Sequence, residues 1–111
     1  MKPKMRIWIE NNKGEMIIGE GLLELLDNIN KTGSLKEASS EMNMSYRTAW
    51  GKINKVEKRL DIKLINSRTG GWGAGGSTLT EEGKSFMKKF SKLKSKQEEV
   101  LKKNFNEIFK D

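Results

Sequence analysis

Cysteine and histidine are both absent from this sequence. Their absence excludes disulfides, thiol nucleophiles, zinc sites built from Cys and His, and acid–base catalysis by imidazole. The carboxylates do not compensate, because neither Glu20 with Glu24 nor Glu98 with Glu99 is accompanied by a partner base or an apolar pocket. We therefore predict no catalytic residues, no metal ligands and no cofactor, and we expect a protein that is not an enzyme.

Long apolar runs are missing as well. No stretch approaches the roughly 18 residues needed to span a bilayer, and the N-terminal MKPKMRIWIEN lacks the apolar core of a signal peptide. We therefore expect a cytoplasmic protein without a membrane partner. The apolar share of 34% is low against a charged share of 33%, which indicates that part of the chain is solvent-exposed or completes its core with a partner.

Positive charge dominates a chain whose length fits one domain. The 22 Lys and Arg residues outnumber the 15 Asp and Glu residues, which gives a net charge of +7. A surplus of this sign favours a polyanionic partner such as DNA or RNA. Basic proteins without a nucleic-acid role also exist. The positions of the cations along the chain therefore have to show whether this protein binds nucleic acid.

The N-terminal residues 1–19 have the pattern of a β-hairpin. Apolar and polar residues alternate from Met5 to Glu10, which predicts a half-buried strand with Trp8 on the side away from the core. A turn with two asparagines and a glycine follows, and then a second strand from Glu15 to Gly19. An isolated hairpin is marginal in water, so this one has to pack on the helices that follow or on a second subunit.

Two helices are predicted after the hairpin. Apolar residues recur at spacings of three and four from Gly21 to Asn30, which is typical of an amphipathic helix. Gly33 is predicted to end this helix in the left-handed conformation. Ser34 followed by Glu37 fits a capping box, in which each side chain binds a free N–H at the start of a helix, so the second helix begins at Leu35.

A third helix is predicted from its N-cap Ser45 to Leu60, after a tight connection that starts at Met42. Its apolar side comprises Ala49, Trp50, Ile53, Val56 and Leu60, and Trp50 is assigned to the core because it is in register with Ile53 and Val56. Its opposite side comprises Arg47, Thr48, Gly51, Lys52, Lys55 and Lys58, with Arg59 alongside. Two capped helices with this connection predict a helix-turn-helix whose second helix enters the DNA major groove.

Two side chains at the start of this third helix have specific expected roles. Arg47 is the best candidate for contacting guanine, because its planar guanidinium matches the O6 and N7 acceptors in the major groove. Tyr46 has two open interpretations, a phosphate contact or packing between helices.

A wing is predicted from residues 62–79. A strand from Ile62 to Ser67, a glycine-rich stretch and a strand from Ser77 to Leu79 follow the helix-turn-helix, as in winged helices. The stretch contains a formal G-x-G-x-x-G, but a dinucleotide fingerprint requires a helix after it, and here a strand follows. Trp72 near the tip is expected to insert into a groove, stack on a base or pack on a second subunit.

The last segment, residues 80–111, is predicted to be one long helix with Thr80 as its N-cap. Apolar residues recur at spacings of three and four along a narrow stripe, and the rest is mostly Lys, Glu, Ser and Asn. Such a stripe favours a partner helix. The predicted dimerisation residues are Phe86, Phe90, Leu93, Val100, Leu101, Phe105 and Ile108.

The fold class expected from these patterns is mainly α with small β, a winged helix-turn-helix with an N-terminal β-hairpin and a long C-terminal dimerisation helix. Residues 1–111 are taken as a single domain, divided into hairpin (1–19), helices (20–61), wing (62–79) and dimerisation helix (80–111). The predicted DNA-binding residues are Ser34, Lys36, Ser45, Tyr46, Arg47, Thr48, Lys52, Lys55, Arg68 and Trp72.

The run GSLKEASSEMNMSYRTAWGKINKVEKRLDIKLINSRTGGWGAGGSTLTEEGKSF resembles the N-terminal DNA-binding domain of the molybdate-responsive ModE regulators, which is related to the LysR-type winged helix. The points of similarity are Gly33-Ser34, Ser45-Tyr46 with Ala49-Trp50, Arg68-Thr69-Gly70-Gly71, and Leu79-Thr80 before Gly83. The resemblance implies a winged helix-turn-helix that binds operator DNA as a dimer through its long last helix. Members with the full architecture carry C-terminal molybdate-binding domains. This chain ends at Asp111 without one, so we do not expect it to sense the oxyanion itself, and an effector-sensing partner is left open.

The expected function is that of a sequence-specific regulator that binds double-stranded DNA as a homodimer. Two alternatives remain at this point. Winged helices also serve as protein-interaction modules, and the stripe on the last helix would suit a different protein partner. A non-specific, chromosome-associated DNA-binding protein would also be basic, but it would bind all sequences with uniform affinity.

Overall fold

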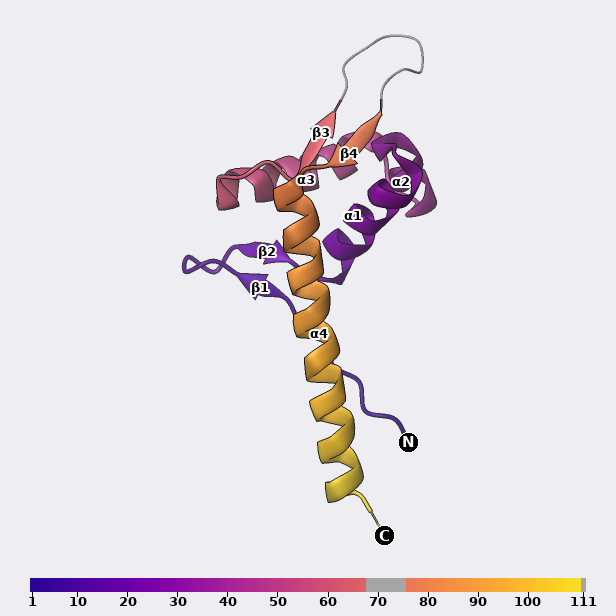
Figure 1. The fold of residues 1–111 in the computed structure, drawn as a ribbon, viewed down its shortest axis with the longest axis vertical. Coiled ribbons are helices and arrows are strands. Elements are labelled where there is room, and N and C mark those ends of the chain that lie inside the picture. The colour runs from indigo at the N-terminus through magenta and orange to yellow at the C-terminus, as the bar shows by residue number, and fades with distance from the viewer. Residues whose placement is uncertain (68–75, 111) are drawn as a thin grey trace.

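The computed structural model describes residues 1–67 and 76–110, which form four helices and two hairpins. In chain order the elements are β1 (Ile9–Glu10), β2 (Met16–Ile18), α1 (Glu20–Thr32), α2 (Leu35–Glu41), α3 (Tyr46–Leu60), β3 (Ile65–Ser67), β4 (Ser77–Leu79) and α4 (Glu81–Ile108). The helices α1, α2 and α3 and the two hairpins form a head, and α4 runs from the head to the far end of the molecule (Figure 1). The longest dimension of 62 Å, against 30 and 23 Å for the others, follows from this helix.

The helix ends follow local capping rules, as the sequence predicts. Gly33 has φ +70° and donates its N–H to Ile29 O at 2.8 Å. The hydroxyls of Ser34, Ser45 and Thr80 each accept a bond from the N–H three residues later. One half of the predicted capping box is wrong, because the N–H of Ser34 donates to Thr32 Oγ1 at 3.2 Å instead of to Glu37.

The N-terminal hairpin is shorter than predicted. The paired strands are only two and three residues long, with Ile9 opposite Ile18. Trp8 is exposed, as expected, while Ile7 and Ile9 pack against the core. Arg59 fastens the hairpin to α3, since its Nη1 donates to Met16 O at 2.7 Å and its Nε lies 3.4 Å from a Glu15 carboxylate oxygen. The hairpin therefore packs on this chain's own helices, one of the two options left open by the sequence.

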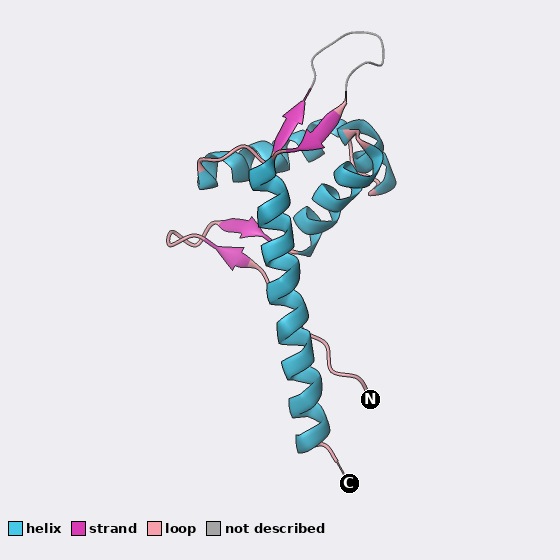
Figure 2. Ribbon diagram, viewed as in Figure 1, coloured by secondary structure: helices cyan, strands magenta, loops and turns pink. Residues whose placement is uncertain are grey.

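One hydrophobic core joins all these elements. Its buried residues come from both hairpins and all four helices: Ile17, Ile18, Leu25, Leu26, Ile29, Leu35, Ala38, Ala49, Ile53, Val56, Leu64, Ile65, Leu79 and Phe90. Figure 2 shows the two small sheets as separate pairs of strands on a mainly helical body. The expected class, mainly α with small β, is confirmed.

The second hairpin begins later than predicted. β3 starts at Ile65 rather than at Ile62, because the chain before it is held on the end of α3: the N–H of Ile62 donates to Glu57 O at 3.3 Å and the N–H of Leu64 to a Glu57 carboxylate oxygen at 2.7 Å. β4 occupies the predicted residues and pairs antiparallel with β3. The glycine-rich stretch between them, with the predicted DNA-binding residues Arg68 and Trp72, lies outside the described residues.

The first turn of α4 is fixed to the chain segment before β3. Thr80 donates its N–H to Leu64 O at 2.9 Å and its hydroxyl to Lys63 O at 2.6 Å. Gly83 is buried against the same Leu64 backbone, where a Cβ on Gly83 would lie 2.2 Å from the carbonyl oxygen. The position and direction of α4 are therefore set by backbone contacts at its start.

The structure corrects the predicted role of Phe90 in α4. Phe90 is only 2% exposed and belongs to the core of its own chain, and Phe86 packs partly buried against that core. Phe90 is therefore not available to a second subunit, because α1 and β4 already pack against this part of α4, whereas Phe86 keeps part of its surface exposed. Within the described residues, no helix combines the length and the apolar character required to cross a membrane.

Candidate nucleic-acid interface

Helices α2 and α3 have the geometry of a helix-turn-helix. The turn at Met42 to Ser45 is tight: Asn43 takes φ +55°, and the N–H of Met44 donates to Ser39 O at 3.0 Å. Ala38 is fully buried where the two helices meet, which allows a close approach. The turn and the small residue together fix the angle at which α3 leaves α2.

Helix α3 buries one side and exposes the rest. Ala49, Ile53 and Val56 are in the core, as predicted. Trp50 is not: it is 47% exposed, so its assignment to the core is wrong. It lies beyond the edge of the buried side, together with Tyr46, which is 52% exposed. The interpretation in which Tyr46 packs between helices is therefore excluded by its exposure.

The exposed surface of α3 is strongly basic. The sequence of this helix, YRTAWGKINKVEKRL, contains five cations and one acid. That acid, Glu57, faces the chain before β3, where it also lies 3.8 Å from Lys63 Nζ, and Arg59 is engaged with the hairpin. The remaining cations of α3 are exposed and have no salt bridge among the described residues: Arg47, Lys52, Lys55 and Lys58.

One side of α3 lines a groove that the sequence did not predict. The groove, of about 780 Å³, has Arg47, Thr48, Lys52 and Lys55 on the α3 side. We call it the basic groove. Its opposite side is largely apolar and comes from β2, the start of α1 and the helix-turn-helix turn: Met16, Ile17, Gly19, Leu22 and Met44. The hairpin thus gives the basic side of α3 a facing wall.

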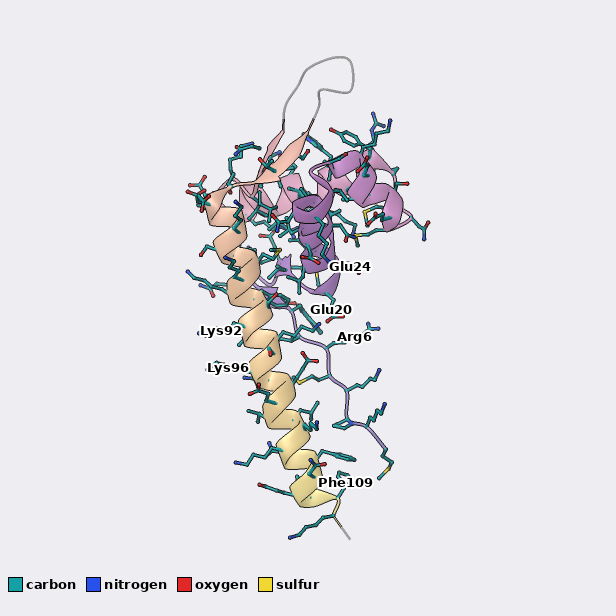
Figure 3. The ribbon with its side chains drawn as sticks, turned by 45° about the vertical axis from the view of Figure 1, so that its right-hand side comes forward. Arg6, Glu20, Glu24, Lys92, Lys96 and Phe109 are labelled. Atoms are coloured by element: carbon teal, nitrogen blue, oxygen red, sulfur yellow. The ribbon has the colours of Figure 1, made fainter. Side chains whose placement is uncertain are left out.

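An ion pair lies at the edge of the basic groove. Glu20, at the start of α1, pairs with Lys94 of α4. The hydrogen bond from Lys94, and after it the positive charge of the same ammonium, hold the pKa of the Glu20 carboxyl below its usual value. Figure 3 shows Glu20 and Arg6 on one side of α4, with Lys92 and Lys96 on the other. Because Glu20 is already paired, it adds little negative potential to the groove.

The structure brings together five of the predicted DNA-binding residues on the exposed surface of α3: Tyr46, Arg47, Thr48, Lys52 and Lys55. Ser45 lies at the start of the same helix, where its hydroxyl donates to Thr48 Oγ1 at 2.9 Å. Ser34 and Lys36 lie apart from this group, at the start of α2. The Ser34 hydroxyl is occupied by the Glu37 N–H, whereas Lys36 is exposed.

The predicted dimerisation residues divide along α4. Beyond the partly buried Phe86 and the buried Phe90, the side chains of Leu93, Val100 and Ile108 are 38%, 50% and 74% exposed. Leu101 and Phe105 line a hollow of about 620 Å³ together with residues 1–5. Phe109 was not predicted to belong to the stripe, yet it is 60% exposed and stacks on Phe105 with ring centroids 4.9 Å apart. Its spacing of four residues from Phe105 is the signal that would have identified it.

Comparison with known proteins agrees with this geometry. Residues 21–84 match the family described as "Bacterial regulatory helix-turn-helix protein, lysR family". The DNA-binding transcriptional dual regulator ModE of Escherichia coli (strain K12) is 30% identical over 79 residues, which are 71% of this chain and 30% of that protein. The molybdenum transport protein ModE of Herbaspirillum seropedicae is 41% identical over 56 residues, or 50% of this chain and 21% of that protein. The chain therefore spans under a third of the length of these relatives.

Two solved structures are similar in fold. The "Crystal structure of CbnR_DBD-DNA complex" superposes with a TM-score of 0.56 and 17% identity, covering 72% of this chain and 90% of that one. ArgP from Mycobacterium tuberculosis superposes with a TM-score of 0.53 and 15% identity, covering 72% of this chain and 28% of that one. At these identities the comparison concerns the fold alone, and it confirms the winged-helix class.

Proposed function

Since the chain belongs to the lysR family of bacterial regulatory helix-turn-helix proteins, we propose that it is a cytoplasmic transcriptional regulator that binds specific double-stranded DNA as a homodimer. The observation that carries the proposal is the exposed, basic surface of α3 at the end of a helix-turn-helix. An α-helix is 10–12 Å wide with its side chains, and the major groove of B-DNA is about 12 Å wide, so α3 fits with both of its flanks against DNA.

The proposed contacts divide by chemistry. Arg47 reads guanine from the exposed surface of α3, and Ser45 and Thr48 provide adaptable hydroxyls beside it. Lys52 and Lys55 neutralise phosphates of the strand that runs along the basic groove, and Lys36 reaches the backbone from the start of α2. Arg68 and Trp72 remain predicted contacts of the wing with the backbone or the minor groove. Under this proposal residues 1–111 act as one unit, a reading head with its dimerisation helix.

The proposed homodimer forms through the far half of α4. Leu93, Val100 and Ile108 expose apolar surface there, and Phe109 extends it. Burying an aliphatic side chain contributes about 1.5–3 kcal/mol before the cost of association. Two heads held by paired helices would read two half-sites, separated by about 34–36 Å when they face the same side of the duplex.

Selection from a pool of random duplexes tests the proposal. We expect the wild-type protein to enrich a near-palindromic sequence, with affinity that falls linearly in a log–log plot against salt concentration. The slope then gives the number of phosphates neutralised. Failure to retain any duplex at low salt would favour a protein-docking module instead, and uniform affinity for all sequences would favour a non-specific chromosome-associated protein.

Two substitutions on α3 separate sequence reading from charge. We expect Arg47→Ala to lose about 1–3 kcal/mol on the selected duplex and to relax the preference at one base position. Lys58→Ala removes an exposed cation near the end of α3, so we expect it to lower the affinity for the selected duplex and for random duplexes by the same factor. Competition binding with both duplexes measures the difference, and equal losses on the two duplexes for both variants would refute the division.

A further inference from the structure

Trp50 and Tyr46 form an exposed aromatic flank on α3. They are one helical turn apart, so they lie on the same side of the helix. Their exposed fractions are 47% for Trp50 and 52% for Tyr46. Each ring presents a large apolar surface to solvent in the N-terminal half of α3, the part of a recognition helix that meets base edges. The core of the head does not use this surface, since its cluster comprises neither ring.

The surroundings of the aromatic flank indicate what would cover it. Arg47 lies between the two rings in sequence, and three exposed lysines follow on the same helix. Of these cations Arg47 lies nearest the rings, about 60° around the helix from Trp50, while Lys52 and Lys55 line the basic groove on another side of α3. Duplex DNA can cover the rings and also offer phosphates to the cations on the other sides of the helix. Trp50 itself is 47% exposed, so a partner can reach the indole. Charge complementarity therefore favours a polyanion as the occupant.

The major groove offers one apolar group to such a flank. Guanine, cytosine and adenine present hydrogen-bond acceptors and donors there, while thymine adds its C5-methyl group. The edge of an indole has the right chemistry for that methyl, because the contact removes apolar surface of both partners from water. The guanidinium of Arg47 is a hydrogen-bond donor and has no equivalent interaction with the thymine methyl group.

We propose that Trp50, with Tyr46 beside it, reads thymine by contact with the C5-methyl group in the major groove. This inference rests on the proposed function and adds a specificity-determining residue to it. A site bound by this protein should then contain a thymine on the strand that faces the aromatic flank, next to the base pair that Arg47 reads.

Replacement of thymine by deoxyuridine tests the inference, because it removes only the methyl group and keeps the base pair. In the selected duplex, each thymine is replaced in turn and wild-type affinity is measured. We expect one or two positions at which the loss is about three- to fivefold, the effect of one buried methyl group. Trp50→Ala should weaken the thymine duplex about tenfold or more and bind the thymine and uracil duplexes equally well.

Trp8→Ala is the matched control, since Trp8 is 50% exposed but lies outside α3. This variant should keep both the affinity and the thymine preference. Wild-type binding that is indifferent to every uracil replacement would overturn the inference without any variant, as would a preference that Trp50→Ala retains. A lower mass of Trp50→Ala in sedimentation would also overturn it, by assigning the ring to self-association. If the wild type binds no duplex at all, the proposed function fails first.

Discussion

Gly83→Ala is expected to destabilise the protein by about 3 kcal/mol or more, because the new methyl group meets backbone atoms that have no room to move. A Cβ at this position would lie 2.2 Å from the Leu64 carbonyl oxygen and 3.0 Å from its carbon. Relieving that overlap requires α4 to move away from the chain before β3. The move would break the bond from the Thr80 N–H to Leu64 O, which is 2.9 Å long in the native fold.

Urea unfolding followed by circular dichroism measures the loss. Gly51→Ala is the matched control, since Gly51 also lies within a helix but its Cβ would meet nothing within 4 Å. Alanine has the higher helix propensity, so this control should gain about 1 kcal/mol. The two variants are thus expected to shift stability in opposite directions. Equal stability of Gly83→Ala and wild type would mean that α4 does not dock on the Leu64 backbone as described.

Val100→Asp combined with Ile108→Asp is expected to convert the proposed dimer into a monomer and to weaken operator binding about 100-fold or more. Both side chains are well exposed in the single chain, at 50% and 74%, so the substitutions leave the core of the head intact. In the proposed dimer the carboxylates would instead enter an apolar seam. Losing the link between the two heads removes the advantage of binding two half-sites together, which is worth factors of 10²–10⁴.

Sedimentation equilibrium reads out the mass, which should fall from twice 12.7 kDa to 12.7 kDa. Ser85→Asp combined with Ser95→Asp is the control: both residues are exposed on α4 but away from the apolar stripe, and the change in charge is the same. This control should stay dimeric. A wild-type mass of 12.7 kDa at micromolar concentration would refute the proposed homodimer but not the proposed DNA binding by α3.

Local rules in the sequence predicted the helix ends well. Ser45 and Thr80 cap their helices through bonds to residues three positions later, and Gly33 takes the left-handed conformation. Such features depend on a few neighbouring residues, so periodicity and residue type suffice to find them. The exposed basic side of α3 was predictable for the same reason, since it is a property of one helix.

The sequence-based predictions were wrong where the burial or the contacts of a residue depend on an element that is distant in the chain. A helical period places Trp50 near the apolar side of α3, but how far the neighbouring elements wrap around that side depends on the fold, and they stop short of the indole. Phe90 belongs to a continuous stripe on α4, and only the position of the head shows that this chain buries it. The bond from Arg59 to Met16 spans 43 residues, so no local pattern could have removed Arg59 from the basic side of α3.

Because α4 is fixed to the head at its start, its orientation determines the orientation of the head. From Glu81 to Ile108 it has 28 residues, which at 1.5 Å per residue is about 42 Å of continuous rod. Because Thr80 and Gly83 clamp one end to the head, the rod and the head turn together. A change of 5° in the crossing angle at the far end would move the two heads by about 4 Å relative to each other, on the order of one base-pair step. The angle between two distant helix ends would thereby set which operator spacing the paired heads can span.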